Sequence, residues 1–506
     1  MAADCPPNLL ILMADQMTPF ALPAYGHRLV QAPFITSLAT EGAVFDAAYC
    51  NSPLCAPSRA VLMSGLLPSA TGAYDNAAPL PPDIPTFTHH LRALGYLTVL
   101  TGKMHFCGSD QLHGFEERLT TDIYPADFNW TPDWDHPELR PSWYHNMSSV
   151  IDAGPCVRTN QLDFDDEVVF TAERRIYDLA RSPESRPFCM VVSLTHPHDP
   201  FAVPQRFWDL YDGLAIDPPR FIPAPDAVDP HSRRLRFVCA MDETPVTQAQ
   251  VLRARRAYYG AISYVDEQFA RVAAALRSCA LADDTIIIVL SDHGEMLGEH
   301  GLWYKMSFRE GAARIPLIVH APGRISPRRV PHAVSIVDLL ATLVELGGGT
   351  EPMTRTDGRS LLPHLRGDDG HDAVFGEYLA EGVVAPMLMI RRGRYKFIHT
   401  PGDPDQLFDL TEDPNEVINL AGEPRFATLT TAFRNELRGR WDVAELRQKV
   451  LESQQRRRII DAALRRGQRY GWDWQPPRDA TAEYIRTHMD LDDLERKARL
   501  PRTTPP

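Results

Sequence analysis

The sequence predicts an α/β protein built on a large mixed, mostly parallel β-sheet flanked by helices. Three apolar runs, at residues 9–14, 188–194 and 285–290, carry this prediction, because a parallel strand buried on both faces reads as an uninterrupted apolar run. Helical patterns separate the runs, and this alternation is typical of a parallel sheet covered on both faces. Such sheets bind ligands beyond the carboxyl ends of their strands, which is where polar residues follow each run.

The first two strands predicted along the chain lead directly into ionisable residues. The first apolar run stops at Asp15. A helical pattern over residues 86–94 ends at a glycine, and residues 96–100 then predict a strand that delivers Lys103 and His105. We expect these side chains to lie at one edge of the sheet.

The two later strands repeat this arrangement. The run at residues 188–194 leads into a proline-containing loop that carries His198. A long helical stretch over residues 247–281 precedes the third run, which is followed at once by Asp292 and His293. Polar chemistry therefore follows each predicted strand of the central sheet.

The pattern changes after about residue 370. Short strands separated by turns are predicted at residues 387–391, 395–398 and 406–410, followed by helix, which indicates a smaller C-terminal α+β subdomain with antiparallel strands. The last stretch is rich in arginine and has little periodicity, so we expect an extended C-terminal tail. The predicted division is a catalytic domain at 1–370, the smaller subdomain at 371–453 and the tail at 454–506.

Composition argues against several classes of function. The chain of 506 residues has 66 acidic and 52 basic residues, and its net charge of −14 disfavours a protein that tracks nucleic-acid phosphates. The N-terminal apolar run is too short to span a membrane and no basic region precedes it, so we expect a cytoplasmic protein with no membrane partner. Its eight cysteines form no CxxC pair and are expected to be mostly reduced and buried.

One cysteine stands where a helix is predicted to begin, in the stretch Cys55-Ala56-Pro57-Ser58-Arg59. Pro57 fits a first helical turn, whose free N–H groups and positive dipole end would make a seat for an anion beside Cys55. Arg59 could add a forked donor suited to sulfate or phosphate oxygens. The same residues fit equally well a capped helix with a surface arginine.

Two carboxylates and an imidazole are predicted to meet at the strand ends. Asp15 and Asp292 each follow a strand and His293 adjoins the second, so their ligand atoms could converge on a divalent cation. Ca²⁺, Mg²⁺ and Mn²⁺ are all compatible with these residues, and the imidazole favours Mn²⁺. Taken singly, each aspartate could instead cap a helix or lie in a solvated loop.

Four further side chains on similarly placed loops could serve a reaction. They would stabilise a multiply charged anionic transition state and protonate a leaving oxygen. Any one of them could be a surface residue, but together with Cys55 and the carboxylates they favour an active site. They are Lys103, His105, His198 and Lys305.

The stretch around Cys55 resembles the C-x-P-S-R signature of the sulfatase family, in which the cysteine is oxidised to formylglycine after translation. Other stretches are similar to that family's metal-binding segments, and several resemble its choline-sulfatase branch, so the resemblance spans nearly the whole chain. The metal-type segments are residues 12–15 and 291–295, and the stretches similar to choline sulfatases are residues 101–108, 111–125, 454–458, 472–476 and 488–492.

This resemblance implies an alkaline-phosphatase-like fold and hydrolysis of a sulfate monoester by hydrated formylglycine at position 55. It also implies a formylglycine-generating enzyme as a maturation partner, and a divalent metal ion that is Ca²⁺ by family, with Mn²⁺ or Mg²⁺ as alternatives. The metal ligands would be Asp15, residue 55, Asp292 and His293. Arg59 and Lys103 would support position 55, His105, His198 and Lys305 would contact sulfate or act as acid and base, and Asn76 would contact the substrate.

The branch that the chain resembles implies choline-O-sulfate as the substrate. A quaternary ammonium cannot donate a strong hydrogen bond, so its site should combine aromatic faces with a carboxylate. Trp130 is the leading aromatic candidate, and Glu381 is the candidate counter-charge. The tryptophan-containing tail suggests a homo-oligomer, a dimer or tetramer, in which the tail reaches a neighbouring subunit and lends a carboxylate such as Asp490.

The chain departs from many sulfatases at two positions, Gln16 where a second aspartate is common and His293 where asparagine is common. Both features resemble the choline-sulfatase branch, and they leave the identity of the metal open. The alternatives are a phosphonate or phosphate ester hydrolase or an arylsulfatase of the same superfamily, because one fold can serve several reactions. A catalytically silent anion-binding homologue, in which Cys55 is never modified, is a further alternative.

Overall fold

A nine-stranded sheet lies at the centre of the part of the chain that the computed structural model describes, residues 6–182, 186–469, 471–477 and 486–500. Its order is β11-β2-β10-β8-β1-β6-β3-β4, and β9 pairs with β2. The short strands β5 (Gly154–Cys156) and β7 (Ala202–Pro204) pair separately. The main strands are β1 Asn8–Asp15, β2 Ala43–Tyr49, β3 Leu97–Gly102, β4 Glu117–Arg118, β6 Phe188–Pro197, β8 Thr285–Ser291, β9 Arg314–Ile315, β10 Leu317–His320 and β11 Arg328–Ser335.

The sheet is mixed but mostly parallel, as predicted. β1 pairs in parallel with β6 and β8, and β3 pairs in parallel with β6, whereas β10 runs antiparallel to β2 and β8. The four strands predicted from the sequence in this region are β1, β3, β6 and β8, which are neighbours at the middle of the sheet and almost wholly buried. β6 continues to Pro197 instead of ending at residue 194, and the Asp165 carboxylate accepts hydrogen bonds from the backbone N–H groups of Thr195 and His196.

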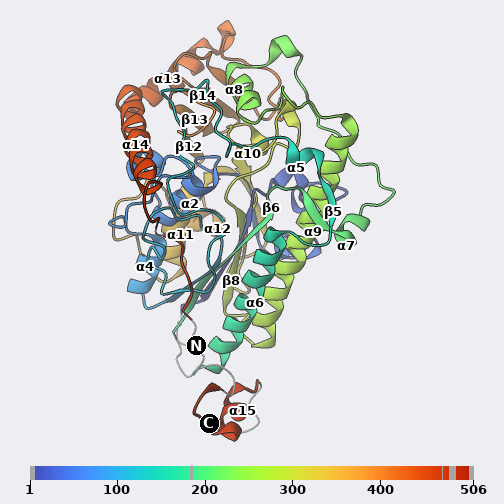
Figure 1. The fold of residues 1–506 in the computed structure, drawn as a ribbon, viewed down its shortest axis with the longest axis vertical. Helices are drawn as coiled ribbons and strands as arrows, with labels where there is room; N and C mark the ends of the chain where they lie inside the picture. The colour runs from blue at the N-terminus through green and yellow to red at the C-terminus, as the bar shows by residue number, and fades with distance from the viewer. Residues whose placement is uncertain (1–5, 183–185, 470, 478–485, 501–506) are drawn as a thin grey trace.

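Helices cover both faces of this sheet. Figure 1 shows α6 (Asn160–Arg181) and α9 (Gln248–Ser278) on one side, and α2 (Cys55–Ser64), α4 (Phe87–Ala93) and α11 (Leu339–Leu346) on the other. The helices predicted at residues 86–94 and 247–281 are therefore α4 and α9. The shorter helices are α1 Pro33–Glu41, α3 Pro68–Thr71, α5 Ser148–Ile151, α7 Gln205–Asp209, α8 Pro230–Val238, α10 Glu310–Ala313 and α12 Leu362–Arg366.

A smaller antiparallel sheet comes next along the chain, in the order β12-β13-β14-β15. The three strands expected here are β13 (Met387–Arg392), β14 (Tyr395–His399) and β15 (Gln406–Asp409), while β12 (Ala373–Tyr378) was not predicted. Lys396 of β14 is fully buried between the carboxylates of Glu310 and Glu416, at 2.8 and 2.6 Å. This buried ion cluster joins the small sheet to α10, which lies between β8 and β9 of the main sheet.

The expectation of an extended tail from residue 454 is wrong at its start. After α13 (Ala427–Arg440), helix α14 runs from Val443 to Leu464. The second half of its buried face consists of polar residues that include Gln454, Arg457 and Asp461, so this half of the helix gives no apolar pattern. Residues 471–477 form no helix or strand, and α15 (Leu491–Ala498) lies below the body of the molecule in Figure 1.

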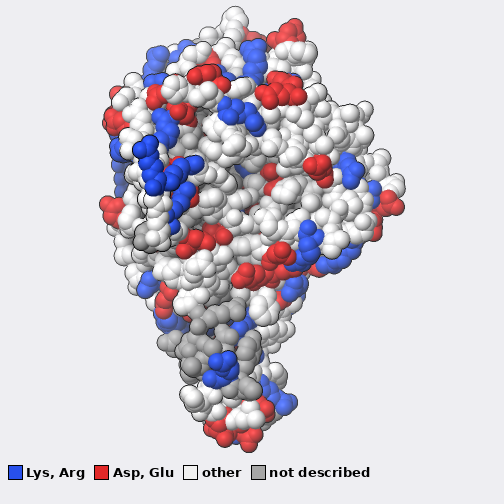
Figure 2. Space-filling view, viewed as in Figure 1, with Lys and Arg blue, Asp and Glu red and all other residues white. Residues whose placement is uncertain are grey.

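The seven described cysteines are all free thiols, and five of them are buried. Among the described helices, none is long and apolar enough to cross a membrane. Acidic and basic side chains are interspersed over the face shown in Figure 2.

Candidate active site

The four central strands end side by side, and each delivers a polar group. β8, β1, β6 and β3 are consecutive in the sheet and parallel to one another. Asp292 follows β8, Asp15 ends β1, His198 follows β6 and Lys103 follows β3. The alignment of parallel strands therefore gathers residues from four distant parts of the sequence at one edge.

Cys55 lies over this edge as the first residue of α2. Pro57 is in the first turn, as predicted, and the side chain of Cys55 is 1% exposed. The side-chain oxygen of Asn76 accepts a hydrogen bond of 3.0 Å from the backbone N–H of Ala56. Asn76 thus satisfies one of the free N–H groups at the helix start and fixes the backbone next to Cys55.

The structure brings together all four residues predicted to bind a metal. One ligand atom from each of Asp15, Cys55, Asp292 and His293 lies within 4.8 Å of every other. The Nδ1 atom of His293 lies 3.0 Å from the carbonyl oxygen of Gly294, and a hydrogen bond there leaves Nε2, 3.2 Å from the Cys55 sulfur, free to face the cluster. Two carboxylates and one imidazole, all buried, are a donor set that fits a divalent cation.

Two buried cations balance the carboxylates. Arg59 Nε donates to Asp292 at 2.8 Å, and its NH2 group lies 3.5 Å from Asp15. Lys103 Nζ donates to the same oxygen of Asp15, Oδ2. Burial would raise the pKa of Asp15, but Lys103 and the other nearby positive charges hold that pKa below its ordinary value. Asp15 is therefore ionised and ready to bind a cation.

The surroundings of Cys55 favour negative charge at that position. Burial would raise the pKa of its thiol, but Lys103, Lys305 and His293 hold that pKa well below its usual range. The same positive field would stabilise the charge that develops on a nucleophile or a sulfate oxygen at this place.

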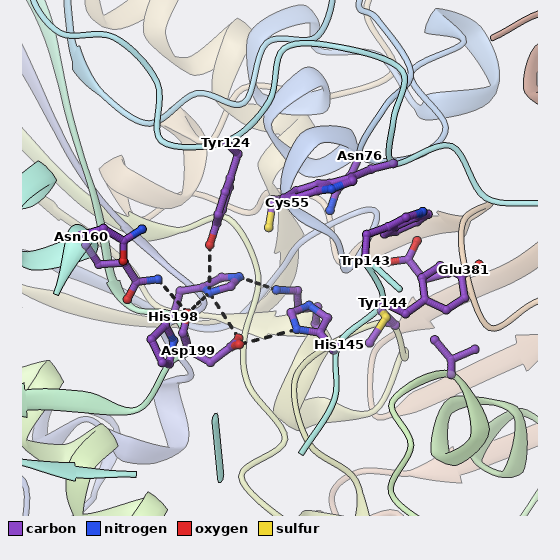
Figure 3. Close-up of a pocket in the computed structure, with 16 residues that line it drawn as sticks. Cys55, Asn76, Tyr124, Trp143, Tyr144, His145, Asn160, His198, Asp199 and Glu381 are labelled. Carbon is purple, nitrogen blue, oxygen red and sulfur yellow. Dashed lines mark hydrogen bonds and ion pairs between the residues drawn. The ribbon is translucent and has the colours of Figure 1, made fainter. Parts of the chain in front are cut away.

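His198, labelled in Figure 3, forms a hydrogen-bonded pair with Lys305 on the wall of the cavity. Lys305 Nζ lies 2.7 Å from His198 Nε2 and donates to the side-chain oxygen of Gln16 at 2.6 Å. His198 Nδ1 is 2.7 Å from the carbonyl oxygen of Asp199, so the ring donates there and accepts from Lys305. Gln16, the departure noted in the sequence, bonds Lys305 with its side chain and donates from its backbone N–H to Asp292 at 3.1 Å.

The ring of His105 is buried against Tyr124 and Trp130 but has no hydrogen-bond partner among the described residues. Its side chain is 3% exposed, and neither ring nitrogen makes a hydrogen bond to the described residues. Its backbone N–H is held at 2.8 Å by the carboxylate of Asp122. A buried imidazole without a hydrogen-bond partner marks a place where a ligand would supply that hydrogen bond.

A cavity of about 210 Å³ opens next to Cys55, and its far side is aromatic. Trp130 stacks on Trp143 with ring centroids 6.2 Å apart, and Tyr124 lies 5.4 Å from Trp130. Figure 3 shows Trp143, Tyr144 and Glu381 together on the side away from His198. The sequence prediction of Trp130 missed Tyr124, Trp143, Tyr144 and His145; the density of Trp and Tyr between residues 124 and 144 was the available signal.

Glu381 is the buried carboxylate of the aromatic side. It is 4% exposed, and its Oε2 atom has no hydrogen-bond partner among the described residues. Burial raises the pKa of Glu381 to about 7, and the negative charge of Asp75 acts in the same direction. A cationic ligand would supply the missing partner.

A second possible metal cluster and Asp490 contribute less to the candidate site. His145, His198 and Asp199 also lie close enough together to suggest a metal site, but both ring nitrogens of His198 are already engaged. Asp490, predicted to act on a neighbouring subunit, caps α15 by accepting from the N–H of Asp492 at 3.0 Å and does not line the cavity of its own chain.

Residues 7–349 match the sulfatase family, and the chain belongs to that family. It is a sulfuric ester hydrolase. Residues 448–500 match the C-terminal segment of choline sulfatases, and residues 298–442 match the C-terminal segment of N-sulphoglucosamine sulphohydrolases.

Individual relatives refine this assignment. The chain is 47% identical to the choline-sulfatase of Rhizobium meliloti (strain 1021) over 98% of its own length and 99% of that protein. It is 30% identical to arylsulfatase K of Xenopus laevis, with 82% and 79% of the two chains covered. The phosphonate monoester hydrolase of Agrobacterium radiobacter has a similar structure, with a TM-score of 0.69, 26% identity and coverage of 88% and 96%. These similarities confirm the predicted alkaline-phosphatase-like fold.

The metal cluster generates one prediction. Replacing Asp292 by alanine removes one candidate ligand and the carboxylate that accepts from Arg59 Nε, so we expect metal affinity to fall by more than the ~10–100-fold that loss of an outer-shell partner costs. Elemental analysis after dialysis, followed by metal titration, would measure this. Asp212→Ala, at an aspartate whose side chain is 81% exposed, is the control. Equal metal content in both variants would contradict the assignment.

Proposed function

We propose that the chain hydrolyses choline-O-sulfate to choline and sulfate. One observation carries the proposal: a single cavity has a nucleophile position beside a metal-type cluster at one end and aromatic rings with an unpaired buried carboxylate at the other. Aromatic faces and a carboxylate suit a quaternary ammonium, which donates no strong hydrogen bond. The similarity to the choline-sulfatase of Rhizobium meliloti supports this choice of alcohol.

The nucleophile is proposed to be formylglycine made from Cys55 by a formylglycine-generating enzyme. A hydrated aldehyde would supply one hydroxyl to attack sulfur and a second to release the sulfate afterwards. Position 55 fits this group, because the positive surroundings that lower the pKa of the thiol would also favour an ionised hydroxyl there. Arg59 and Lys103, which are held by ion pairs with Asp292 and Asp15, would support position 55.

A divalent ion would be held by Asp15, residue 55, Asp292 and His293, with Ca²⁺, Mn²⁺ and Mg²⁺ as the candidates. When bound, it supplies positive charge that stabilises the oxygens of the sulfate.

The remaining groups bind the ester and move a proton. Choline leaves as an alkoxide unless it is protonated, so the reaction needs an acid near the bridging oxygen. The hydrogen-bonded pair of His198 and Lys305 places a transferable proton at the cavity wall. Asn76 lines the cavity, and we propose that it contacts the sulfate group together with His105, whose ring nitrogens have no hydrogen-bond partner among the described residues.

The structural similarity to a phosphonate monoester hydrolase favours one alternative, a phosphonate or phosphate ester hydrolase. Comparing kcat/KM for choline-O-sulfate, phenyl sulfate, a phosphate monoester and a phosphonate monoester would separate the two. The proposal requires choline-O-sulfate to be the preferred substrate. A preference for either phosphorus ester would replace it.

Replacing Cys55 by alanine should leave the fold intact but reduce kcat by on the order of 10⁶-fold, because the attacking hydroxyl belongs to the modified residue. Peptide mass spectrometry of the unmutated chain should show a loss of about 18 Da at Cys55, as the covalent nucleophile requires. Cys156→Ala, at a half-buried cysteine outside the cavity, is the control. An unmodified thiol in a fully active preparation would remove formylglycine from the mechanism.

The raised pKa of Glu381 predicts a pH-dependent affinity for the ammonium group. The carboxyl is charged above its pKa of about 7 and neutral below it. The KM for choline-O-sulfate should therefore rise as the pH falls from about 8 to about 6, because the cation loses its counter-charge. The KM for phenyl sulfate should change much less, and Glu381→Gln should remove the difference. An unchanged pH profile in that variant would exclude Glu381 from the site.

The proposed role of the tail in a neighbouring subunit needs a truncation that spares α14. Ending the chain after Pro477 removes α15 and Asp490 but keeps residues 471–477, where Trp474 Nε1 donates to the carbonyl oxygen of Arg118 at 3.1 Å. We expect a smaller oligomer and a KM for choline-O-sulfate raised by ~10-fold or more, the usual effect of losing a charged contact. Asp490→Asn should raise KM without changing the oligomer. If neither variant differs from the intact chain in light scattering or KM, the tail has no such role.

A further inference from the structure

Arg457 of α14 is a buried arginine in a helix whose neighbouring arginine is exposed. Its guanidinium donates two parallel hydrogen bonds of 2.7 Å to the carboxylate of Asp75, and the two side chains are 5% and 0% exposed. The same guanidinium donates to the hydroxyl of Thr131 at 3.0 Å. Such a two-pronged pair fixes direction as well as distance, because the planar fork matches the carboxylate.

Each partner of Arg457 is next to a residue of the candidate site. Asp75 precedes Asn76, which holds the backbone beside Cys55. Thr131 follows Trp130, which lines the aromatic side of the cavity. Arg457 therefore joins two cavity loops that are more than fifty residues apart in the sequence.

A second buried residue on the same face of α14 makes a further contact with the loops around the cavity. Gln454, fully buried and three residues before Arg457, accepts a hydrogen bond of 3.0 Å from the backbone N–H of Trp134. Trp134 in turn donates from its indole to the carbonyl oxygen of Ala380 at 2.8 Å, next to Glu381. The network thus reaches the loops of Trp130 and Glu381, and neither Arg457 nor Gln454 contacts the metal-ligand cluster.

We propose that Arg457 is a positioning residue that sets the shape of the alcohol half of the cavity by holding the Asp75–Asn76 and Trp130–Thr131 loops against α14. The ammonium choice rests on the proposed function. The aromatic rings and Glu381 must face the same point to bind a compact cation, so a small shift of either loop weakens that binding. On the sulfate half, the groups at strand ends keep their geometry, and Asn76 is the sulfate-side residue on a loop that Arg457 holds.

Inhibition by the two products tests this division directly. Arg457→Gln should raise the inhibition constant of choline by ~10-fold or more, and that of inorganic sulfate by clearly less, because Asn76 is the sulfate-side residue next to Asp75. The kcat/KM for choline-O-sulfate should fall mainly through KM, while that for phenyl sulfate stays within about fivefold. Arg456→Gln, the same change at the exposed neighbour, is the matched control and should match the unmutated chain.

Two further variants separate positioning from loss of folding. Asp75→Asn combined with Arg457→Gln removes both buried charges together and should recover part of the choline affinity that Arg457→Gln loses. Thr131→Val deletes the third hydrogen bond, together with the one of 2.8 Å that the hydroxyl donates to the carbonyl oxygen of Phe128, and should weaken choline binding in the same direction while the chain stays folded by circular dichroism. Thr131→Val and the double variant also decide the outcome if Arg457→Gln does not fold.

The proposal is overturned if choline and sulfate inhibition weaken equally in folded variants, or if choline inhibition is unchanged in all of them. If the proposed function itself were wrong, these experiments would give a different result. In that case the unmutated chain itself would show no preference for choline-O-sulfate and no inhibition by choline.

Discussion

The arrangement of the site depends on buried positive and negative charges that balance one another. Asp15 and Asp292 end neighbouring parallel strands, so the sheet itself places two negative charges side by side. Unpaired, such buried charges would be very costly, and Arg59 and Lys103 are buried with them to compensate. Because Arg59 belongs to α2, the same ion pairs also set where Cys55 lies relative to the strand ends. Helix, strands and candidate nucleophile are therefore fixed by one set of contacts.

The two ends of the cavity are built differently. The sulfate end consists of Cys55 at the start of α2 and of residues at the tips of central strands, whose positions are set by hydrogen-bond register. The alcohol end consists of residues such as Trp130, Trp143 and Glu381, which lie outside helices and strands. Contacts from the loops' own neighbours and from α14 supply that support. The groups proposed to carry out the reaction and the groups proposed to recognise the alcohol are thus held by different parts of the fold, although they line one cavity.

Features that depend on local pattern were largely predictable from the sequence. The central strands appear as continuous apolar runs because they are buried on both faces, and the polar residues after them mark the site edge. The structure accordingly gathers Asp15, Cys55, Asp292 and His293, although their roles stay proposals. Trp143 could not be paired with Trp130 in advance, because their stacking depends on the path of an irregular loop. The helical continuation through Arg457 was missed because its buried face is polar, and an apolar period is the signal for a buried helix face.

The burial of α2 has a consequence for the order of events as the protein is made. All ten residues of this helix are buried, and Cys55 itself is 1% exposed at the bottom of its cavity. An enzyme that must hold several residues around the cysteine while it oxidises the thiol has no access once the helix has packed. The proposed conversion of Cys55 would therefore belong to the interval between synthesis and packing, and a chain that folded first would keep its thiol.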